Sequence, residues 1–281
     1  MPILYLLLIL QAGLVVTGGA VRITGSGLGC PTWPTCTGSS YVPIAGQAEG
    51  TLHSWIEFGN RLLTFLLFFA AIAAIIYALR KARKDLLWRA ALQLLGILGQ
   101  GILGGITVLT KLNPLSVASH FILSIFLIAG AASLVERGRT PLISIRPVEI
   151  KLRVLATLHV ALAFLVIVIG TLVTGSGPHA GDWQAPRLHL DHRSITWLHA
   201  DVVIALLGVT LALFVLSDIS PESKKRIKYF FVATLIQGLI GYTQYAQGLP
   251  ELLVVIHLFG STLVWLTTWR IWLSITTAEG K

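Results

Sequence analysis

Eight stretches that are almost free of charged residues restrict the folds open to this chain. They run over 2–21, 62–79, 90–110, 112–135, 154–177, 195–216, 229–246 and 252–269. Each is close to the length of about 20 mostly apolar residues that a helix needs to cross a bilayer. Turn residues at 113–114 separate the third stretch from the fourth, and 248–250 separate the seventh from the eighth. The sequence therefore predicts an all-α integral membrane protein with eight transmembrane helices.

Composition excludes the soluble alternatives. Only 12% of the 281 residues are charged and 55% are hydrophobic, whereas a soluble domain has about 25% charged residues. So few charges cannot cover a soluble fold, which excludes a soluble enzyme, a nucleic-acid-binding domain and a disordered chain. The first stretch lacks a basic region before it and a clear small-residue cleavage site after it. We therefore expect a retained helix rather than a cleaved signal peptide.

The net charge of +9 predicts a topology. Sixteen of the 21 lysines and arginines lie in 80–89, 137–153 and 224–228 or at 270 and 281. These segments follow every second predicted span, so they lie on one side of the membrane. The other five are Arg22, Arg61, Lys111, Arg187 and Arg193. Short loops rich in lysine and arginine stay in the cytoplasm. We expect a multi-pass protein of the cell membrane with both termini cytoplasmic, and no nucleic-acid partner.

Two sequence tracts recur and indicate an internal repeat. Thr-Gly-Ser-Gly at 24–27 returns 150 residues later at 174–177. Gln-Gly-x-x-Gly at 100–104 returns at 237–241, and the same offset of 137 carries His120 onto His257 and Ser124 onto Ser261. A unit of four spans returns to its starting side, so the repeats are not inverted as in many transporters. We expect two four-helix halves, 1–139 and 140–281.

Histidines inside the spans are the first candidates for chemistry, because ionisable groups in a membrane are costly and usually functional. His199 lies near the outer end of the sixth span, and His257 lies at similar depth in the eighth. Two neutral imidazoles on facing helices can hold a haem iron from both sides. The alternative is two separate histidines, each hydrogen-bonded within the bundle. His120, in the fourth span, is the N-terminal equivalent of His257.

The second span breaks this pattern. Alignment with the sixth span places Asn60 opposite His199, and asparagine is a poor iron ligand. The N-terminal half then offers one imidazole, that of His120, and an open iron position suited to reaction. The C-terminal half, with two ligands, is suited to electron transfer.

One face of the second span gathers polar residues, since His53, Glu57, Asn60 and Arg61 are spaced at i, i+4, i+7 and i+8. Glu57 is a candidate general base, hydrogen-bonding group or weak ligand; the competing interpretation is an ion pair with Arg61. His53 is an interfacial histidine or a substitute iron ligand, although it lies about 10 Å along the helix axis from Asn60.

Arginines and cysteines on the predicted outer side complete the candidate set. Arg22, Arg61 and Arg187 suit bidentate contacts with haem propionates, or they snorkel at the membrane interface. The only two cysteines, Cys30 and Cys36, lie in the first outer loop. A structural disulfide is expected there, with a redox-active pair as the alternative. Zinc is disfavoured because two thiols do not complete a site.

Several motifs together resemble those of the haem A synthases, a family of bacterial membrane proteins. Residues 18–31, Gly-Gly-Ala-Val-Arg-Ile-Thr-Gly-Ser-Gly-Leu-Gly-Cys-Pro, look like the family's first-loop signature. Residues 57–61, Glu-Phe-Gly-Asn-Arg, sit where the family has Glu-x-x-His-Arg. The segment 109–120 is similar to the third-loop motif, and 174–182 and 241–245 also match. The resemblance covers nearly the whole chain.

The resemblance implies two pseudo-symmetric four-helix bundles with unequal haem sites. It implies haem b in the C-terminal half, with His199 and His257 as axial ligands. It implies haem O as substrate in the N-terminal half, with His120 as iron ligand and Glu57 as the essential acidic residue. The implied activity is oxidation of the C8 methyl of haem O, through an alcohol, to the formyl group of haem A for terminal oxidases. The loop cysteines are implied to handle haem or exchange electrons.

Asn60 stands where other members have a ligand histidine, so the substrate iron is expected to be five-coordinate or to take Glu57 or His53. Two other functions remain as alternatives. A b-type cytochrome relaying electrons to or from quinone predicts equal ligand pairs in both halves. A membrane haem carrier predicts no face centred on Glu57. The expected partners are haem O, the haem O synthase, membrane lipid and, as one option, further copies of the chain; the electron acceptor is left open.

Overall fold

The computed structural model is almost entirely helical. It is described for residues 1–139, 143–145, 149–216 and 219–279. The helices are α1 (Pro2–Ile23), α2 (Thr51–Arg80), α3 (Lys84–Leu109), α4 (Pro114–Arg139), α5 (Ile150–Ser176), α6 (His192–Leu216), α7 (Pro221–Ala246) and α8 (Glu251–Thr276). Two three-residue strands, β1 (Ile143–Ile145) and β2 (Thr277–Glu279), pair antiparallel with Ile143 opposite Glu279. Each predicted span falls on one helix, so the all-α fold is confirmed apart from this short ribbon.

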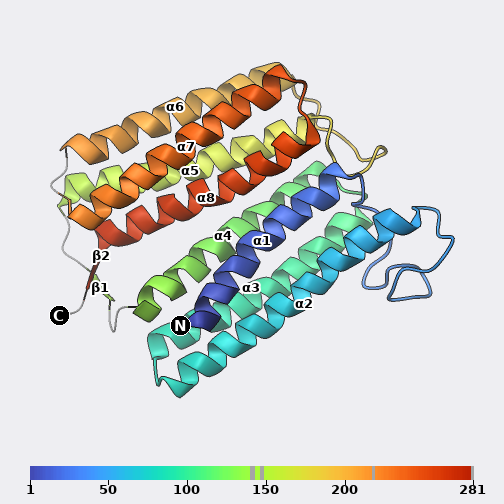
Figure 1. Ribbon diagram of the computed structural model, residues 1–281, viewed down its shortest axis with the longest axis horizontal. Coiled ribbons are helices and arrows are strands. Elements are labelled where there is room, and N and C mark those ends of the chain that lie inside the picture. Colours follow the sequence, from blue (N-terminus) through green and yellow to red (C-terminus); the bar gives the residue numbers. More distant parts are fainter. Residues whose placement is uncertain (140–142, 146–148, 217–218, 280–281) are drawn as a thin grey trace.

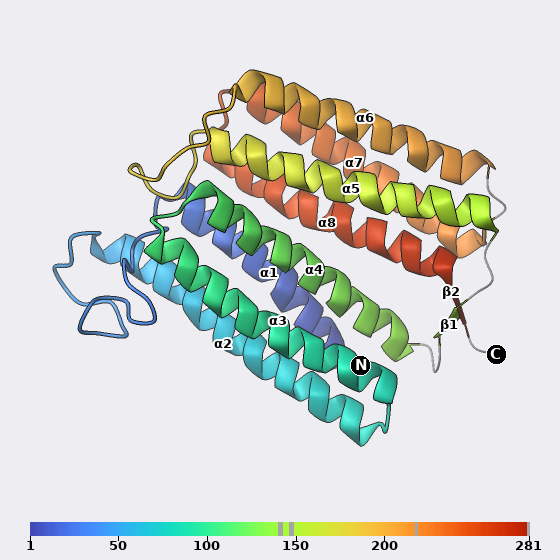
Figure 2. The ribbon, with the colours of Figure 1, turned by 180° about the vertical axis from the view of Figure 1, so that it is seen from behind.

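Among the residues that the structure describes, seven helices are long and apolar enough to cross a membrane, and α7 is not one of them. The first two turns of α7 carry Lys224, Lys225, Arg226 and Lys228, and its remainder includes Gln237 and Gln244. The prediction of eight helices is thus confirmed, whereas apolar character alone supports seven spans. α7 nevertheless packs along α8 and runs beside it in both views (Figures 1 and 2).

Capping residues mark where helices begin. Pro221 occupies the first turn of α7, where a missing N–H is harmless, and Ser220 Oγ accepts a hydrogen bond from the Ser223 N–H. Asp191 accepts a hydrogen bond of 2.8 Å from the Ser194 N–H at the start of α6. Hydrogen bonds from the Ser194 side chain and backbone hold the pKa of the Asp191 carboxyl below its usual range. Such caps matter because unpaired backbone groups are costly near lipid.

The two sets of four helices pack differently. In the N-terminal half, α1–α4, each helix packs on its neighbours, and α4 returns to α1 to close a ring. Buried alanines such as Ala71, Ala74 and Ala90 allow these helices to approach closely. In the C-terminal half, α5–α8, α5 packs on α6 and α8, and α7 packs on α8, but α6 and α7 have few contacts. The C-terminal ring is therefore open between α6 and α7.

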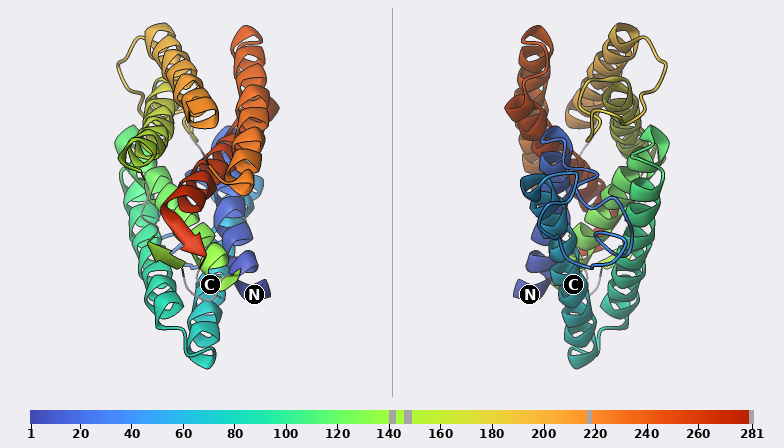
Figure 3. Two further views of the ribbon diagram at one scale, coloured as in Figure 1. Left: turned by 90° about the vertical axis from the view of Figure 1, so that its left-hand side faces the viewer. Right: turned by 90° about the vertical axis from the view of Figure 1, so that its right-hand side faces the viewer.

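The two halves join where α1 and α4 pack on α8 and where α4 packs on α5. The indole N–H of Trp265 donates to the Ile125 carbonyl at 2.8 Å, and that of Trp269 donates to Ser133 Oγ at 2.8 Å. The carboxylate of Glu136 binds Arg226 and Arg270 at the end of the molecule that carries both termini. Figure 3 shows the two halves from both ends, with the long 24–50 loop at the end opposite the termini.

The sidedness of the loops agrees with the charge pattern. The basic turns at 80–89 and 224–228 lie at the end of the molecule where the chain begins and ends (Figure 1). The predicted boundary between 139 and 140 falls where the described part of the structure is interrupted. The basic residues Arg146 and Lys281 also lie outside the described residues.

Candidate functional site

The recurring Gln-Gly-x-x-Gly tract supports a histidine in each half. Gln100 Nε2 in α3 donates to the His120 carbonyl at 3.1 Å, and Gln237 Nε2 in α7 donates to the His257 carbonyl at 2.5 Å. Gln100 also donates to Ser124 Oγ at 2.6 Å. The same contact in both halves fixes the backbone of α4 and α8 at the histidine. The tract therefore has a structural purpose that its recurrence alone did not reveal.

Glycines make room for three imidazole rings. A Cβ at Gly104 would lie 3.4 Å from His120 Cε1, and one at Gly241 would lie 3.2 Å from His257 Cε1. A Cβ at Gly170, in α5, would lie 3.2 Å from His199 Cε1. Each of these predicted ligands thus rests on a glycine of the neighbouring helix.

The three imidazoles share one electrostatic environment. Nδ1 of each ring (His120, His199 and His257) is buried. The backbones of Val166 and Gln237 lie within reach of the His199 and His257 rings, whereas His120 Nδ1 has no hydrogen-bond partner among the described residues. His199 and His257 lie close enough to interact electrostatically. The two C-terminal histidines, on α6 and α8, are therefore within electrostatic reach of each other, and their joint ligation of iron stays a prediction.

These residues fit a haem. Imidazoles kept neutral by an apolar environment are the form that binds iron, and buried ring nitrogens without partners need such a use. Within the described ranges, no group of three or more His, Cys, Asp or Glu side chains could hold a bare metal ion. A porphyrin iron needs only one or two protein ligands. His199 and His257 would hold it in the C-terminal half, and His120 in the N-terminal half.

The Asn60 side chain is hydrogen-bonded to a neighbouring helix. Thr17 Oγ1 in α1 donates to Asn60 Oδ1 at 2.7 Å. Under the offset of 150 residues that relates α1 to α5, Gly170 corresponds to Ala20. The C-terminal half thus combines a glycine with a histidine, and the N-terminal half combines an alanine with a tethered asparagine. His53, the substitute ligand, has its Nδ1 bonded to Ser26 Oγ at 2.9 Å.

Glu57 and Arg61 form the ion pair that their spacing indicated, with Arg61 Nη2 2.6 Å from Glu57 Oε1. The Glu57 side chain is buried, and its Oε2 accepts a hydrogen bond from the Cys30 N–H at 2.6 Å. Arg61 also donates to the carbonyls of Cys30, Thr32 and Thr35. The pair therefore holds the 24–50 loop on α2, and both carboxylate oxygens of Glu57 are engaged.

The loop cysteines form a disulfide. Cys30 and Cys36 are both fully buried, with Cα atoms 4.3 Å apart. The expected disulfide is confirmed, and the Arg61 contacts place it directly above Glu57. The disulfide and the ion pair of the buried Glu57 with Arg61 thus meet at the end of α2 next to the 24–50 loop.

The other two candidate arginines bind backbone carbonyls at the same end of the molecule. Arg22 donates to the carbonyls of Thr174 (3.0 Å) and His179. Arg187 donates to the carbonyls of Ala185 (2.6 Å) and Pro178 (2.8 Å). Both residues therefore fasten the 177–191 loop, and their contact with haem propionates stays a prediction.

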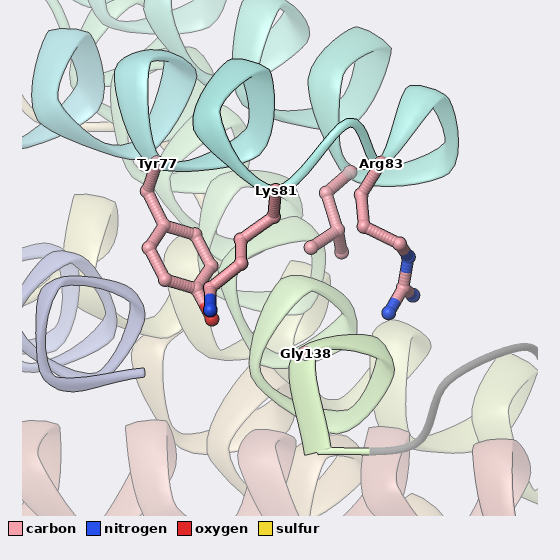
Figure 4. A pocket seen from close by; sticks show the side chains of 5 residues that line it. Tyr77, Lys81, Arg83 and Gly138 are labelled. Atoms are coloured by element: carbon pink, nitrogen blue, oxygen red, sulfur yellow. The ribbon is translucent and has the colours of Figure 1, made fainter.

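Two cavities lie apart from these residues. One, of about 310 Å³, is lined by Tyr77, Lys81, Arg83, Leu86 and Gly138 at the termini end (Figure 4). Another, of about 200 Å³, lies between α1, α4 and α8 and includes Tyr5, Glu136 and Arg270. Neither is lined by a predicted site residue, so the candidate site is defined by the histidines and not by these cavities.

Comparisons with known proteins agree with the motifs. The sequence profile of the cytochrome oxidase assembly protein family (COX15-CtaA) matches residues 2–181, which include Glu57 and His120 and end before His199. A protein named heme A synthase from Methylorubrum extorquens (strain PA1) is 33% identical over 207 residues, 62% of this chain and 53% of the relative. One of the same name from Geobacillus thermodenitrificans is 31% identical over 124 residues, 43% of this chain and 37% of the relative.

A third relative has a different name. A protoheme IX farnesyltransferase from Thermus thermophilus is 27% identical over 279 residues, which are 89% of this chain and 44% of that protein. The chain thus spans between about a third and about half of the length of these three relatives. Family match and apolar helices together make it a multi-pass membrane protein. Because the profile matches well over half of its residues, the chain belongs to the family of cytochrome oxidase assembly proteins.

Proposed function

We propose that this protein is a haem A synthase, which oxidises the C8 methyl of haem O to the formyl group of haem A. The observation that carries the proposal is the inequality of two otherwise matched histidine sites. His199 and His257 lie within electrostatic reach of each other in the C-terminal half, whereas the matching position in the N-terminal half is Asn60, bound to Thr17. The relatives named heme A synthase support the same activity.

In this proposal the C-terminal half holds haem b and the N-terminal half holds the substrate. Haem b supplies one-electron transfer. His199 and His257 would be its axial ligands, and the glycines beside them keep their rings in place. His120 would bind the iron of haem O. With no histidine at residue 60, the other face of that iron stays open for reaction.

Glu57 is the acidic residue proposed for the reaction. It lies three residues before Asn60 on α2, and it is buried against Arg61 and the Cys30 N–H. A carboxylate in this position would accept a proton or orient water near the methyl group. Arg61 and the disulfide loop would hold the carboxylate in place and limit access of bulk water.

We also propose the cell membrane as location, with both termini cytoplasmic, and a haem O synthase as partner. The basic turns at 80–89 and 224–228 support the orientation. The Thermus thermophilus relative supports the partner: its name refers to farnesylation of protohaem, and this chain accounts for less than half of its length. The organisation as halves 1–139 and 140–281 is part of the same proposal, supported by the twin glutamine–histidine contacts.

Coexpression with a haem O synthase tests the activity. Haems extracted from the membranes are separated by chromatography and identified by mass spectrometry. We expect haem A, which is absent when the chain is omitted. If haem O accumulates unchanged while the purified protein carries haem b, the protein is a b-type cytochrome or a haem carrier and the proposal is wrong.

A further inference from the structure

The structure contains two serine–histidine pairs at matching places in the two halves. Ser26 Oγ lies 2.9 Å from His53 Nδ1, and Ser176 Oγ lies 3.1 Å from His192 Nδ1. Both serines belong to the recurring Thr-Gly-Ser-Gly tract. His53 and His192 each stand seven residues before the matched positions Asn60 and His199. The pair is thus preserved between halves that differ in their iron ligands.

Neighbouring hydrogen bonds decide which ring nitrogen carries the proton. The Ser176 hydroxyl donates to the Val173 carbonyl at 3.0 Å, so its oxygen accepts the Nδ1–H of His192. In the other half Thr24 Oγ1 donates to the Ala20 carbonyl and lies 2.8 Å from Ser26 Oγ. The Ser26 hydroxyl therefore donates to Thr24, and its oxygen accepts the Nδ1–H of His53. In each pair the serine engages Nδ1, which leaves the Nε2 atom of the histidine available for another hydrogen bond.

His192 has no such partner within the protein. Its Nε2 is buried and makes no hydrogen bond to the residues that the structure describes. A buried polar atom without a partner is costly unless a ligand or water completes it. His192 and His199 share a face of α6 because they are two turns apart, about 10 Å along the axis. The free Nε2 therefore lies on the loop-end side of the His199 imidazole.

A haem held by His199 and His257 would carry two carboxylate arms as its polar groups. A hydrogen-bonding group on the loop-end side of the His199 imidazole would be available to bind one of them. Arg22 and Arg187, two of the three arginines considered for these arms, already donate to backbone carbonyls. His192 Nε2 is buried at this end of α6 and makes no hydrogen bond to the described residues, so it is free to bind such an arm.

We propose that His192 Nε2 binds a haem carboxylate in the C-terminal half, and that His53 binds the equivalent arm of the substrate in the N-terminal half. The inference rests on the haem sites of the proposed function. In the bound state the imidazole carries a proton on each nitrogen: Nδ1–H donates to the serine and Nε2–H to the carboxylate. Such a charge-assisted hydrogen bond is about twice as strong as a neutral one. His53 is then a carboxylate-binding residue and not an iron ligand.

The test compares His192→Ala, His192→Gln and His189→Ala in the full-length protein purified with its haem. His189 is an exposed histidine in the 177–191 loop just before α6 and serves as the matched control. Haem loss is measured by transfer to excess apomyoglobin, and the midpoint potential by redox titration. His192→Ala should lose haem about tenfold faster, the expected loss for one hydrogen bond to a charged group. Its midpoint potential should fall, because an unpaired carboxylate stabilises ferric iron.

The low-spin spectrum of His192→Ala should persist, since both axial ligands remain. His192→Gln keeps an N–H donor and should recover part of the haem retention. Equal haem loss and equal potential in His192→Ala and His189→Ala would overturn the inference while leaving the haem site intact. A wild-type protein that binds no haem would instead overturn the proposed function. In the N-terminal half, His53→Ala should raise the KM for haem O more than it lowers kcat.

Discussion

The N-terminal and C-terminal halves share the contacts that position their histidines but differ in one candidate iron ligand and in helix packing. Both have a glutamine that binds the carbonyl of a histidine, a glycine beneath that histidine and a serine–histidine pair. They differ at Asn60 against His199, and in packing, since α2 packs on α3 whereas α6 barely contacts α7. The supports that orient imidazoles are thus kept, and the number of ligands and the openness of the ring vary.

The difference in the number of candidate ligands favours electron transfer in the C-terminal half and a reaction on the haem in the N-terminal half. Two ligands saturate an iron and favour electron transfer, whereas one ligand leaves a position for chemistry. The buried Glu57 and the disulfide loop belong to the N-terminal half, for which we propose a single iron ligand. The loop at the matching place in the other half, 177–191, is short and contains no cysteine. The asymmetry of ligands therefore coincides with an asymmetry of potential reaction groups.

Removal of one axial ligand should give the largest effect. We expect His257→Ala to abolish the low-spin haem b spectrum, because one imidazole cannot hold a six-coordinate iron. His120→Ala, the matched change in the other half, should leave that spectrum unchanged. The reduced-minus-oxidised spectrum of the purified variants measures both. A surviving spectrum in His257→Ala, or its loss in His120→Ala, would reverse the assignment of the halves.

Neutralising Glu57 should affect the reaction alone. We expect Glu57→Gln to lower haem A formation about 100-fold or more, as loss of a positioned acid–base group does, with the haem b spectrum unchanged. Arg61 is about one-fifth exposed and keeps its loop carbonyls, so the fold should survive. Haem extraction after coexpression measures conversion, and Glu49→Gln in the same loop is the control. A variant within about tenfold of wild type would leave Glu57 as a structural ion pair only.

Much of this architecture could be predicted from sequence. Apolar stretches predict membrane helices because lipid demands internal hydrogen bonding, and the recurring tracts predicted two halves with a histidine at the same place. The ion pair of Glu57 and Arg61 followed from their i, i+4 spacing. These features are local or periodic, so they are visible along the chain.

Contacts between distant segments could not be predicted in the same way. Gln237 supports His257 across two helices, and Arg61 takes three loop carbonyls, neither of which any spacing encodes. Gly170 was missed because it lies on α5 in a run of apolar residues, and its purpose depends on the packing of α6. The recurrence of Gln-Gly-x-x-Gly was the signal that could have led to the glycines beneath the other two histidines.

A histidine at residue 60 should make the halves more alike. Asn60→His adds a ligand opposite His120, but Ala20 stands where the other half has Gly170. We therefore expect Asn60→His combined with Ala20→Gly to add a second low-spin haem signal and to lower conversion about tenfold or more, since the open iron position is lost. Electron paramagnetic resonance of the purified protein measures the added signal. Thr17→Val is the control, because it removes the hydroxyl contacts to Asn60 and to the Leu14 carbonyl without adding a ligand. No added signal in the double variant would argue against equivalence of the two positions.

The smallest expected effect concerns the glycines beneath the rings. A methyl at residue 241 would lie 3.2 Å from His257 Cε1, whereas a methyl at residue 238, one turn earlier on α7, meets nothing within 4 Å. Gly241→Ala should therefore weaken haem retention about three- to tenfold, because His257 must shift, while Gly238→Ala should be neutral or stabilise the helix by about 0.5–1 kcal/mol. Haem transfer to apomyoglobin and thermal melting distinguish the two variants. In the N-terminal half the contact to His120 is looser, at 3.4 Å, so Gly104→Ala should cost less than Gly241→Ala. Equal behaviour of Gly241→Ala and Gly238→Ala would show that the ring does not depend on its glycine, and the likeness of the two halves would then reside in the glutamine contact alone.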